Sequence, residues 1–271
     1  MKTEKVRVEL IYHGQVARVT LAAPRANVLD CAMMAGLLAS FHQLHAQSAL
    51  KLILLTGEGS HFSFGASIEE HLPERIADTL QQLNCLLWEV VRAPAPTVAV
   101  VRGQCLGGAF ELALACDLIV ADDTATFGLP EIKLGVFPPA GAALLPPRVG
   151  ASRAAEMVLT GGTWPAATAA AVGLISRVVP ASDLEAKLDE WLLSDFLPRS
   201  RVALQYAAQA TRQPTIDALE HQLPALERLY LEELMRHGDP VEGIRAFLEK
   251  RQPRWELANN AEARVFAGAK T

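Results

Sequence analysis

A hydrophobic run long enough to cross a membrane is missing from this sequence. Although 51% of its 271 residues are hydrophobic, no apolar stretch approaches the roughly 18 residues that a bilayer requires. The opening segment MKTEKVRVEL mixes charged with apolar residues, so it does not have the apolar segment of a secretory signal. We therefore expect a cytoplasmic protein with no membrane partner.

A strong charge of either sign is missing as well. The 30 acidic and 25 basic residues give a formal net charge of −5, which provides no overall attraction to a polyanion. This charge still permits a local basic patch for a small molecule that carries phosphate. Nucleic acid is therefore not an expected partner.

Cysteine is scarce, and no two cysteines form a CxxC pair. The four residues are spread along the chain: Cys31, Cys85, Cys105 and Cys116. A chain of this length does not need disulfides to hold its core together, so we expect reduced core thiols.

A set of metal ligands is also missing. His42 and His45 lie three positions apart in a helical pattern, but no nearby acidic residue or cysteine completes a zinc site. We expect both histidines at the surface and no metal centre.

Strand and helix patterns alternate through the first half of the chain. Val16–Leu21 alternates apolar and polar residues, as a half-buried strand does, and residues 52–55 form an apolar run typical of a buried strand. Helical spacing marks residues 33–44, behind Asp30 as an N-cap, and residues 74–91.

A second such unit follows. Thr97–Val101 predicts another buried strand, and a glycine-rich turn at 103–108 leads into a short apolar helix at 109–116 and a strand at 117–121. The alternation of strands and helices predicts an α/β fold.

The second half is predicted to be largely helical. Two proline pairs, at 138–139 and 146–147, are expected to bracket a loop, and after Ser152 only residues 175–179 are expected to form a strand. Three successive helices are predicted, over residues 201–211, 215–237 and 240–251.

A loose domain boundary is placed near Pro198. It divides the chain into a core at residues 1–197 and a helical C-terminal region at 198–271. The polar, alanine-rich segment from Trp255 onward is predicted to be a mobile end.

Glu111 stands in the segment AFELALAC, where every other residue is apolar. Burying an unpaired charge costs several kcal/mol, so such a carboxylate needs a partner, a proton, or a cavity in which it has a chemical role. The alternative is that Glu111 bonds the free amides at the start of its own helix.

Glu131 is the second isolated acid, in the segment FGLPEI, 20 positions further on. Alone, it is equally compatible with a loop residue paired with Lys133 or with an arginine. Two isolated acids that flank one strand can be brought to opposite sides of a cleft, which suits general acid–base chemistry. The pair is therefore more informative than either member.

Glycines next to these acids supply candidate backbone donors. Gly107 and Gly108 precede the helix that carries Glu111, so its free amides can approach a ligand where the helix dipole favours negative charge. The segment FSFGAS at 62–67 offers a comparable exposed turn. Glycines at turns are more often structural than catalytic, so these alone indicate no activity.

Together these motifs resemble the crotonase (enoyl-CoA hydratase/isomerase) superfamily. The resemblance is carried by residues 62–66, GQCLGGAFELA at 103–113, Cys116-Asp117 and FGLPE at 127–131, and the spacing of the two acids fits. It extends from about Val16 to Trp255. It implies an α/β fold of the ClpP/crotonase type, a spiral of strand–strand–helix units with a helical C-terminal region.

The resemblance implies a site for an acyl-CoA thioester. The amides of Ala66 and Gly108 are expected to hold the thioester carbonyl and to stabilise the charge of an enolate. Glu111 and Glu131 match the acids of relatives that hydrate enoyl-CoA, in which the pair holds one water. We expect Glu111 to activate this water and Glu131 to protonate the carbon next to the thioester. CoA is part of the substrate, so no separate cofactor or metal is implied.

Other activities stay open at this stage. Retention of both acids favours a hydratase over an isomerase, for which an acid at Glu131 can suffice, and over a dehalogenase or hydrolase. A general enoyl-CoA hydratase or isomerase of fatty-acid oxidation is one alternative. A homologue that binds acyl-CoA or a partner without turnover is an alternative of another class.

Two departures from the family pattern bear on the acyl group. Ser67 stands where an aspartate is common, and FPPAGAA at 137–143 replaces a glycine-rich stretch, which predicts a stiffer and bulkier pocket wall. Residues 64–73 are similar to cyclohexa-1,5-diene-1-carbonyl-CoA hydratases of anaerobic aromatic degradation. The candidate wall residues, each equally compatible with plain packing, are Phe64, Ser67, Ile68, Leu72, Val136 and Phe137.

The resemblance also implies CoA contacts and an assembly. Arg25 and Lys250 match regions that contact nucleotide or phosphate, and Phe247 is expected near the adenine, from the same or a neighbouring subunit. Solvated surface charge is the alternative for Arg25 and Lys250. The implied assembly is a homotrimer, or a dimer of trimers, with residues 198–271 as the trimerisation region.

Overall fold

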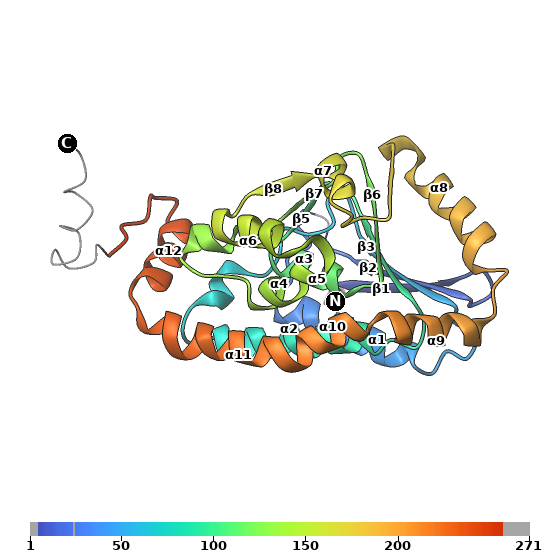
Figure 1. The fold of residues 1–271 in the computed structure, drawn as a ribbon, viewed down its shortest axis with the longest axis horizontal. Coiled ribbons are helices and arrows are strands. Elements are labelled where there is room, and N and C mark those ends of the chain that lie inside the picture. Colours follow the sequence, from blue (N-terminus) through green and yellow to red (C-terminus); the bar gives the residue numbers. More distant parts are fainter. Residues whose placement is uncertain (1–4, 24, 257–271) are drawn as a thin grey trace.

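A six-stranded sheet forms the centre of the structure, a computed structural model that describes residues 5–23 and 25–256 (Figure 1). Its strand order is β1-β2-β3-β4-β6-β9, and only β1 and β2 run antiparallel. In the parallel part, Ile53 pairs with Thr97, and Val98 pairs with Leu118. The strands are β1 Val6–Ile11, β2 Val16–Leu21, β3 Leu52–Gly57, β4 Thr97–Val101, β6 Leu118–Asp122 and β9 Arg177–Val179.

Helices surround this sheet and extend beyond one end of it (Figure 1). The α-helices are α1 Cys31–Leu44, α2 Ile76–Val91, α3 Gly108–Ala115, α4 Pro139–Leu144, α5 Pro146–Val149, α6 Ala151–Thr160, α7 Ala166–Ala171, α8 Leu184–Trp191, α9 Arg201–Thr211, α10 Gln213–Asp217, α11 Leu223–Arg228 and α12 Asp239–Leu248. The 3-10 turns are η1 Ile68–His71, η2 Pro130–Leu134, η3 Ala181–Asp183 and η7 Leu234–Arg236, and the π-helical turns are η4 Leu192–Phe196, η5 Ala218–Gln222 and η6 Leu229–Glu233.

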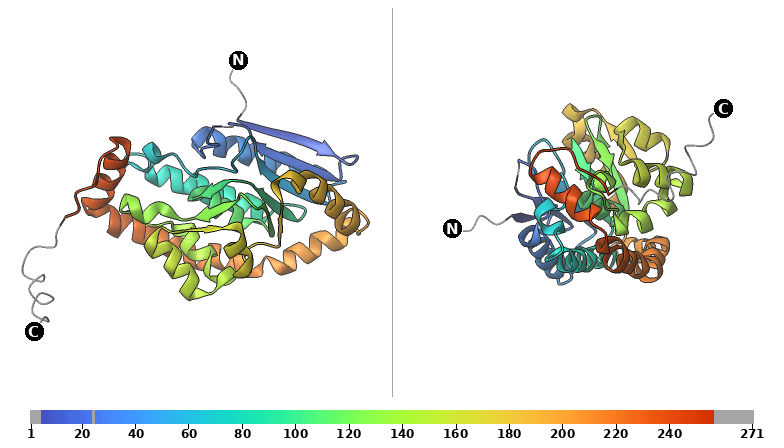
Figure 2. Two further views of the ribbon diagram at one scale, coloured as in Figure 1. Left: turned by 90° about the horizontal axis from the view of Figure 1, so that it is seen from above. Right: turned by 90° about the vertical axis from the view of Figure 1, so that its left-hand side faces the viewer.

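Both faces of the sheet are covered. In β4, Ala99 and Val101 point into the main core with α1 and α2, whereas Val98 and Val100 point into a smaller apolar cluster with α8. Figures 1 and 2 show α1 and α2 on one side of the sheet and α8 apart from them. A strand buried on both faces is apolar on both, which is why this segment lacks polar alternation.

The predicted elements of the first half are confirmed. Asp30 caps α1, because its Oδ1 accepts a 2.9 Å hydrogen bond from the Met33 amide. α2 starts at Ile76, two residues later than predicted, and ends before Pro94. The strands predicted at Val16–Leu21 and Thr97–Val101 have those bounds in the structure.

A second sheet, of order β5-β7-β8, was not foreseen. Its strands are β5 Gln104–Leu106, β7 Thr126–Gly128 and β8 Thr163–Pro165. β5 lies within the stretch predicted as a plain turn, and β8 lies in a stretch predicted to be helical, so both predictions are wrong there. Strands of three residues are too short for a period to be visible in the sequence.

The loop predicted between the two proline pairs is also wrong. α4 begins at Pro139 and α5 begins at Pro146. Proline is well suited to the first position of a helix, because its fixed φ is helical and its missing N–H is not needed there. The proline pairs therefore start two helices.

The C-terminal helices run along the same side of the molecule as α1 and α2 (Figures 1 and 2). α9 and α12 confirm two of the three predicted helices. The third, predicted over residues 215–237, is interrupted by the π-helical turns η5 and η6. Residues 257–271 of the predicted mobile end lie outside the described residues, and the boundary near Pro198 stays a prediction.

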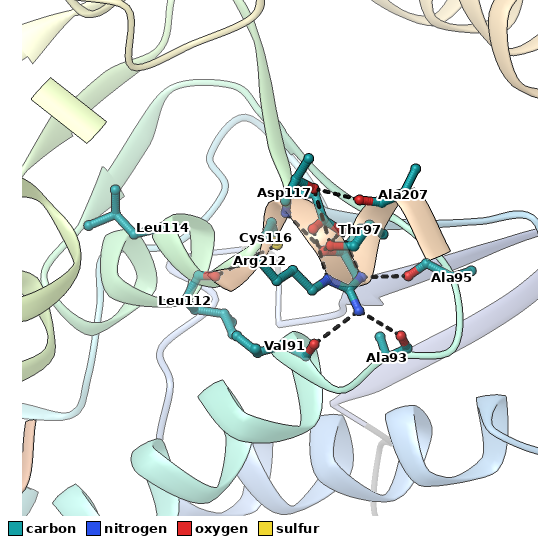
Figure 3. Close-up of polar contacts among 12 residues, drawn as sticks. Val91, Ala93, Ala95, Thr97, Leu112, Leu114, Cys116, Asp117, Ala207 and Arg212 are labelled. Atoms are coloured by element: carbon teal, nitrogen blue, oxygen red, sulfur yellow. Dashed lines mark hydrogen bonds and ion pairs between the residues drawn. The ribbon is translucent and has the colours of Figure 1, made fainter. Parts of the chain in front are cut away.

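Arg212 anchors these helices to the core (Figure 3). Its guanidinium donates from Nε and Nη2 to the Asp117 carboxylate, at 2.8 and 2.7 Å. Its other hydrogen bonds, of 2.8–2.9 Å, go to the main-chain oxygens of Val91, Ala93 and Ala95. Asp117 also accepts a 2.7 Å hydrogen bond from the Thr97 amide. The Cys116-Asp117 motif is thus a structural anchor.

The last described helix returns to the edge of the site. α12 packs against η1 and η2, and Gly243 permits this approach, because an added Cβ would lie 2.2 Å from the Leu134 carbonyl oxygen. Within residues 5–23 and 25–256, no helix combines the length and the apolar character needed to cross a bilayer.

Candidate active site

The turn before α3 is built from glycine because its backbone is left-handed. Gly107 has φ +52°, and its amide donates a 2.9 Å hydrogen bond to the Gly128 carbonyl oxygen in β7. The second sheet therefore holds this turn in place. α3 starts immediately after it, at Gly108.

Glu111 lies in the first turn of α3, with only 3% of its surface exposed. Its Oε1 accepts a 2.6 Å hydrogen bond from the amide of Gly141, at the start of α4. The alternative that Glu111 caps its own helix is therefore wrong, because its partner belongs to another helix. Burial raises the pKa of Glu111 to about 7, although the hydrogen bond from Gly141 opposes this.

Glu131 lies in η2 and is 8% exposed. Its Oε2 is buried, and no described residue donates a hydrogen bond to it. Burial, followed by the charge of Glu111, raises its pKa well above the ordinary value. The alternative of an ion pair with Lys133 or an arginine is wrong for the described residues, among which Glu131 forms no salt bridge.

The two acids border one cavity of about 20 Å³. A cavity of this size has room for about one water molecule. Its wall is formed by the residues Ala66, His71, Thr79, Leu80, Leu83, Gly108, Glu111, Glu131, Phe137, Pro138, Pro139 and Tyr230. The pairing of Glu111 with Glu131 that the sequence predicted is therefore present in the structure.

The candidate amides of Ala66 and Gly108 lie at the same cavity. An added Cβ on Gly108 would stand 3.6 Å from the Ala66 nitrogen and 3.4 Å from its Cβ. Within the described part of the chain, neither amide donates a hydrogen bond. The arrangement can offer two backbone donors to one oxygen atom beside two carboxyl groups.

Asn27 holds the first of these turns in position. Its Nδ2 donates to the carbonyl oxygens of Glu58, His61 and Phe62 at 2.9–3.1 Å, and its Oδ1 accepts from the Ala23 amide at 2.9 Å. The turn is also joined to β5, since Ser63 donates to the Gln104 oxygen at 2.9 Å. Asn27 was not among the predicted site residues.

The predicted wall residues are not all brought to this cavity. Phe137 borders it. Ile68 and Val136 lie in the neighbouring apolar cluster that contains Tyr230. Phe64 is 44% exposed and packs its ring on His61, with centroids 4.9 Å apart. Ser67 and Leu72 are half-buried on either side of η1.

The predicted CoA residues lie on the surface. Arg25, Phe247 and Lys250 are all exposed. Arg25 precedes Ala26, whose oxygen accepts a 3.0 Å hydrogen bond from the amide of Phe64 in the turn at residues 62–67. Phe247 lies in α12, which packs on η1 and η2. α12 is thus in contact with η2, the turn that carries Glu131.

Sequence reasoning missed several residues that border the cavity. Tyr230 comes from the C-terminal helices, and no local signal marked it. Pro138 and Pro139 were noted as stiff loop residues, whereas they also position the α4 amide that binds Glu111. The cavity is formed by contacts between residues about 30 to 100 positions apart in the sequence, and no local pattern encodes such contacts.

The cysteines and the histidine pair His42 and His45 are not among the residues that line the cavity. Cys105 and Cys116 are buried and free, as predicted, but the core prediction is wrong for Cys85, which is exposed. His42 and His45 lie 3.7 and 3.5 Å from Oε2 of Glu89. Among residues 5–23 and 25–256, no group of three or more histidine, cysteine, aspartate or glutamate side chains is arranged to hold a metal ion.

A family model described as enoyl-CoA hydratase/isomerase matches residues 12–258. The chain belongs to this family. It is a hydro-lyase of the enoyl-CoA hydratase type, and its fold is the crotonase fold. An enoyl-CoA hydratase from Mycobacterium avium subsp. paratuberculosis K-10 has a TM-score of 0.82 and 30% identity, over 93% of this chain and 99% of that one.

Two curated relatives are similar over nearly their whole length. The cyclohexa-1,5-dienecarbonyl-CoA hydratase of Thauera aromatica is 42% identical over 251 residues, which cover 93% of this chain and 96% of the relative. The 2,3-dehydroadipyl-CoA hydratase of Escherichia coli (strain K12) is 39% identical over 250 residues, which cover 90% and 97%. Both names describe hydration of a CoA thioester, and they differ in the acyl group.

Proposed function

We propose that this hydratase adds water to a conjugated dienoyl-CoA ring, with cyclohexa-1,5-diene-1-carbonyl-CoA as its substrate. The observation that carries the hydration is the pair of buried acids, Glu111 and Glu131, at one cavity beside the amides of Ala66 and Gly108. The ring is supported by the 42% identity to a cyclohexa-1,5-dienecarbonyl-CoA hydratase and by the bulky Phe137 at the cavity.

The two acids divide the proton transfers between them. Burial raises the pKa of Glu111 to about 7, and burial, followed by the charge of Glu111, raises the pKa of Glu131 well above its ordinary value. Glu111 is therefore partly ionised at neutral pH, and its charge favours the protonated form of Glu131, so that the pair can supply one base and one acid.

Hydration then forms one C–O bond and one C–H bond at the expense of one C=C bond. Glu111 takes a proton from water as the water oxygen attacks the diene, and Glu131 gives its proton to a carbon of the ring. Glu111 later releases its proton and Glu131 takes one up, so the enzyme returns to its first state. Each acid–base step of this kind contributes roughly 10²–10⁴-fold to the rate.

The negative charge that develops during attack spreads to the thioester oxygen. We propose that the amides of Ala66 and Gly108 bind this oxygen, because both residues line the cavity and their amides have no acceptor among the described residues. Loss of one such donor typically raises a barrier by about 2.7–4 kcal/mol. The amides are thus expected to matter as much as the acids.

For the rest of the substrate, we propose that the exposed cations Arg25 and Lys250 bind CoA phosphates and that Phe247 packs near the adenine. The ring is enclosed by Phe137, with Phe64, Ser67, Ile68, Leu72 and Val136 as the outer wall. Arg25→Ala and Lys250→Ala are expected to raise KM more at low than at high salt, with kcat unchanged, because salt screens exposed charges.

Turnover of two substrates tests this function. The protein is incubated with cyclohexa-1,5-diene-1-carbonyl-CoA and, separately, with crotonyl-CoA, and products are followed by mass for the gain of one water. A higher kcat/KM for the ring supports the proposal. A preference for crotonyl-CoA identifies a general enoyl-CoA hydratase. No gain on either substrate contradicts hydration and favours an isomerase or a non-catalytic acyl-CoA-binding homologue.

We also propose that the enzyme is a cytoplasmic homotrimer or dimer of trimers. Large apolar side chains lie exposed on the C-terminal half, on η4, α9 and η6: Leu193, Val202 and Leu229. Burial in a subunit interface would remove this apolar surface from water. Sedimentation equilibrium should give three or six chain masses, and a single chain mass would contradict the assembly.

A further inference from the structure

The hydroxyl of Tyr230 is buried without a partner. The residue is 1% exposed, and no described residue forms a hydrogen bond with its hydroxyl oxygen. Leaving a buried hydroxyl unpaired costs about 1–3 kcal/mol. The presence of an unpaired hydroxyl at this buried position therefore needs an explanation.

Packing explains the ring of Tyr230 but not its hydroxyl. The ring meets Phe137 edge-on, with centroids 5.5 Å apart, and it belongs to an apolar cluster with Ile76, Leu80 and Leu134. A phenylalanine would make all of these contacts without the cost of the buried hydroxyl. The hydroxyl therefore needs a role other than packing.

Tyr230 borders the same cavity as the two acids. It lies in η6, a π-helical turn inside the C-terminal helices, and such turns are frequent at functional sites. Burial, with the charges of Glu131 and Glu111, raises the pKa of Tyr230, so the phenol keeps its proton. A neutral phenol can both donate and accept a hydrogen bond.

The cavity unites three polar groups around a space of about 20 Å³. Oε2 of Glu131 and the Tyr230 hydroxyl are both buried and lack partners among the described residues, and Glu111 lies at the same wall. A bound water needs two to four polar partners. One water-sized oxygen placed here would meet that requirement.

We propose that the Tyr230 hydroxyl holds the reacting oxygen, as water before the C–O bond forms and as the alcohol of the product afterwards. Tyr230 donates to this oxygen, while the water proton goes to Glu111 and the proton of Glu131 goes to carbon. In the reverse reaction the same contact holds the hydroxyl oxygen as the C–O bond breaks and Glu111 returns the proton, so that the oxygen leaves as water. The inference rests on the proposed hydration and adds a third substrate-contacting side chain to it.

The test compares Tyr230→Phe with Tyr206→Phe, a matched control at a tyrosine that is 65% exposed. For each protein, the rate of hydration is measured with the ring substrate and with crotonyl-CoA. The thermal unfolding midpoint of the protein is measured as well, together with its Kd for butyryl-CoA, which has no double bond to hydrate. For Tyr230→Phe we expect a kcat at least about tenfold lower, because one hydrogen bond to the reacting oxygen is lost. We expect an unchanged Kd and an equal or higher midpoint, while Tyr206→Phe matches the parent.

The outcomes separate this inference from the proposed function. If the parent hydrates a substrate and Tyr230→Phe does so at the same rate, the role of Tyr230 is overturned and the hydratase stands. A slower variant with weaker butyryl-CoA binding and a lower midpoint also overturns it, because the ring has then moved. A parent that hydrates neither substrate overturns both.

Discussion

A methyl group on Gly107 would stand 2.7 Å from Oε1 of Glu131. The absence of a side chain at Gly107 therefore leaves the space in which this carboxyl group lies. The backbone there has φ +52° and ψ −133°, a sparsely populated conformation that costs a residue with a Cβ about 1–3 kcal/mol. The glycine thus connects the geometry of the turn to the position of the acid.

Gly107→Ala is expected to lower kcat at least about tenfold, because Glu131 must move away from its proton-transfer position. Steady-state hydration kinetics and a urea titration measure the two effects. Gly14→Ala is the control, since Gly14 also has a positive φ, of +79°, but nothing lies within 4 Å of its added Cβ. Equal activity losses in the two variants would attribute the effect to backbone strain alone.

The acids themselves are tested by amide substitution. Glu111→Gln and Glu131→Gln should each reduce turnover by more than about tenfold with CoA-ester binding largely kept, because glutamine retains the shape but neither accepts nor gives up a proton in this range. Gly108→Pro should abolish activity, since it removes a donor amide. Unchanged rates in both glutamine variants would refute the acid–base mechanism.

The raised pKa of Glu111 sets the low-pH limb of activity. Glu111 must be ionised to accept a proton, and its pKa is about 7. The rate of hydration should therefore rise with pH through about 7, and it should fall again at a higher pH where Glu131 loses its proton. Measurement of kcat/KM between pH 5 and 10 checks this. A rate independent of pH from 5 to about 7 would contradict the role of Glu111 as the base.

The same shift makes a prediction for stability. Because the folded pKa of Glu111, about 7, exceeds its ordinary value of 4.5, the folded state binds more protons, and stability is lost as pH rises from about 4.5 through about 7. Glu111→Gln removes this cost. It should be more stable than the parent above pH 7, by on the order of 3 kcal/mol, and the gain should vanish below pH 4.5.

Urea unfolding at pH 4 and pH 8 measures this difference. The exposed Glu156, substituted in the same way, is the matched control. A gain of the same size at both values of pH would show that the stabilisation does not come from the buried charge.

The Arg212 anchor is tested through its charge partner. Arg212→Met leaves Asp117 without the guanidinium that contacts both of its oxygens, and breaking a buried pair in this way costs about 3–5 kcal/mol. Urea unfolding should show a loss of that size, and Arg153→Met, at an exposed position, should show almost none. When Arg212→Met is combined with Asp117→Asn, the free energy of unfolding should fall by less than the sum of the decreases in the two single variants.

Local patterns were sufficient for the longer elements of the first half. The apolar run at Thr97–Val101 and the capped helix after Asp30 are confirmed, because period and capping are properties of neighbouring residues. Glu111 and Glu131 were recognised for the same reason, since each is a charge among apolar neighbours. Three-residue strands such as β5 and β8 carry too few residues for a period to appear.

By itself, then, the sequence determined the α/β class, the two acids and the family. Only the tertiary structure decided which groups meet at the cavity: the Gly141 amide on Glu111, the unpaired Oε2 of Glu131, and Tyr230 from a helix about 100 residues later. It also decided that Asp117 anchors Arg212. The physical reason is that burial and hydrogen-bond partners depend on contacts between distant segments, whereas periodicity is written in adjacent residues.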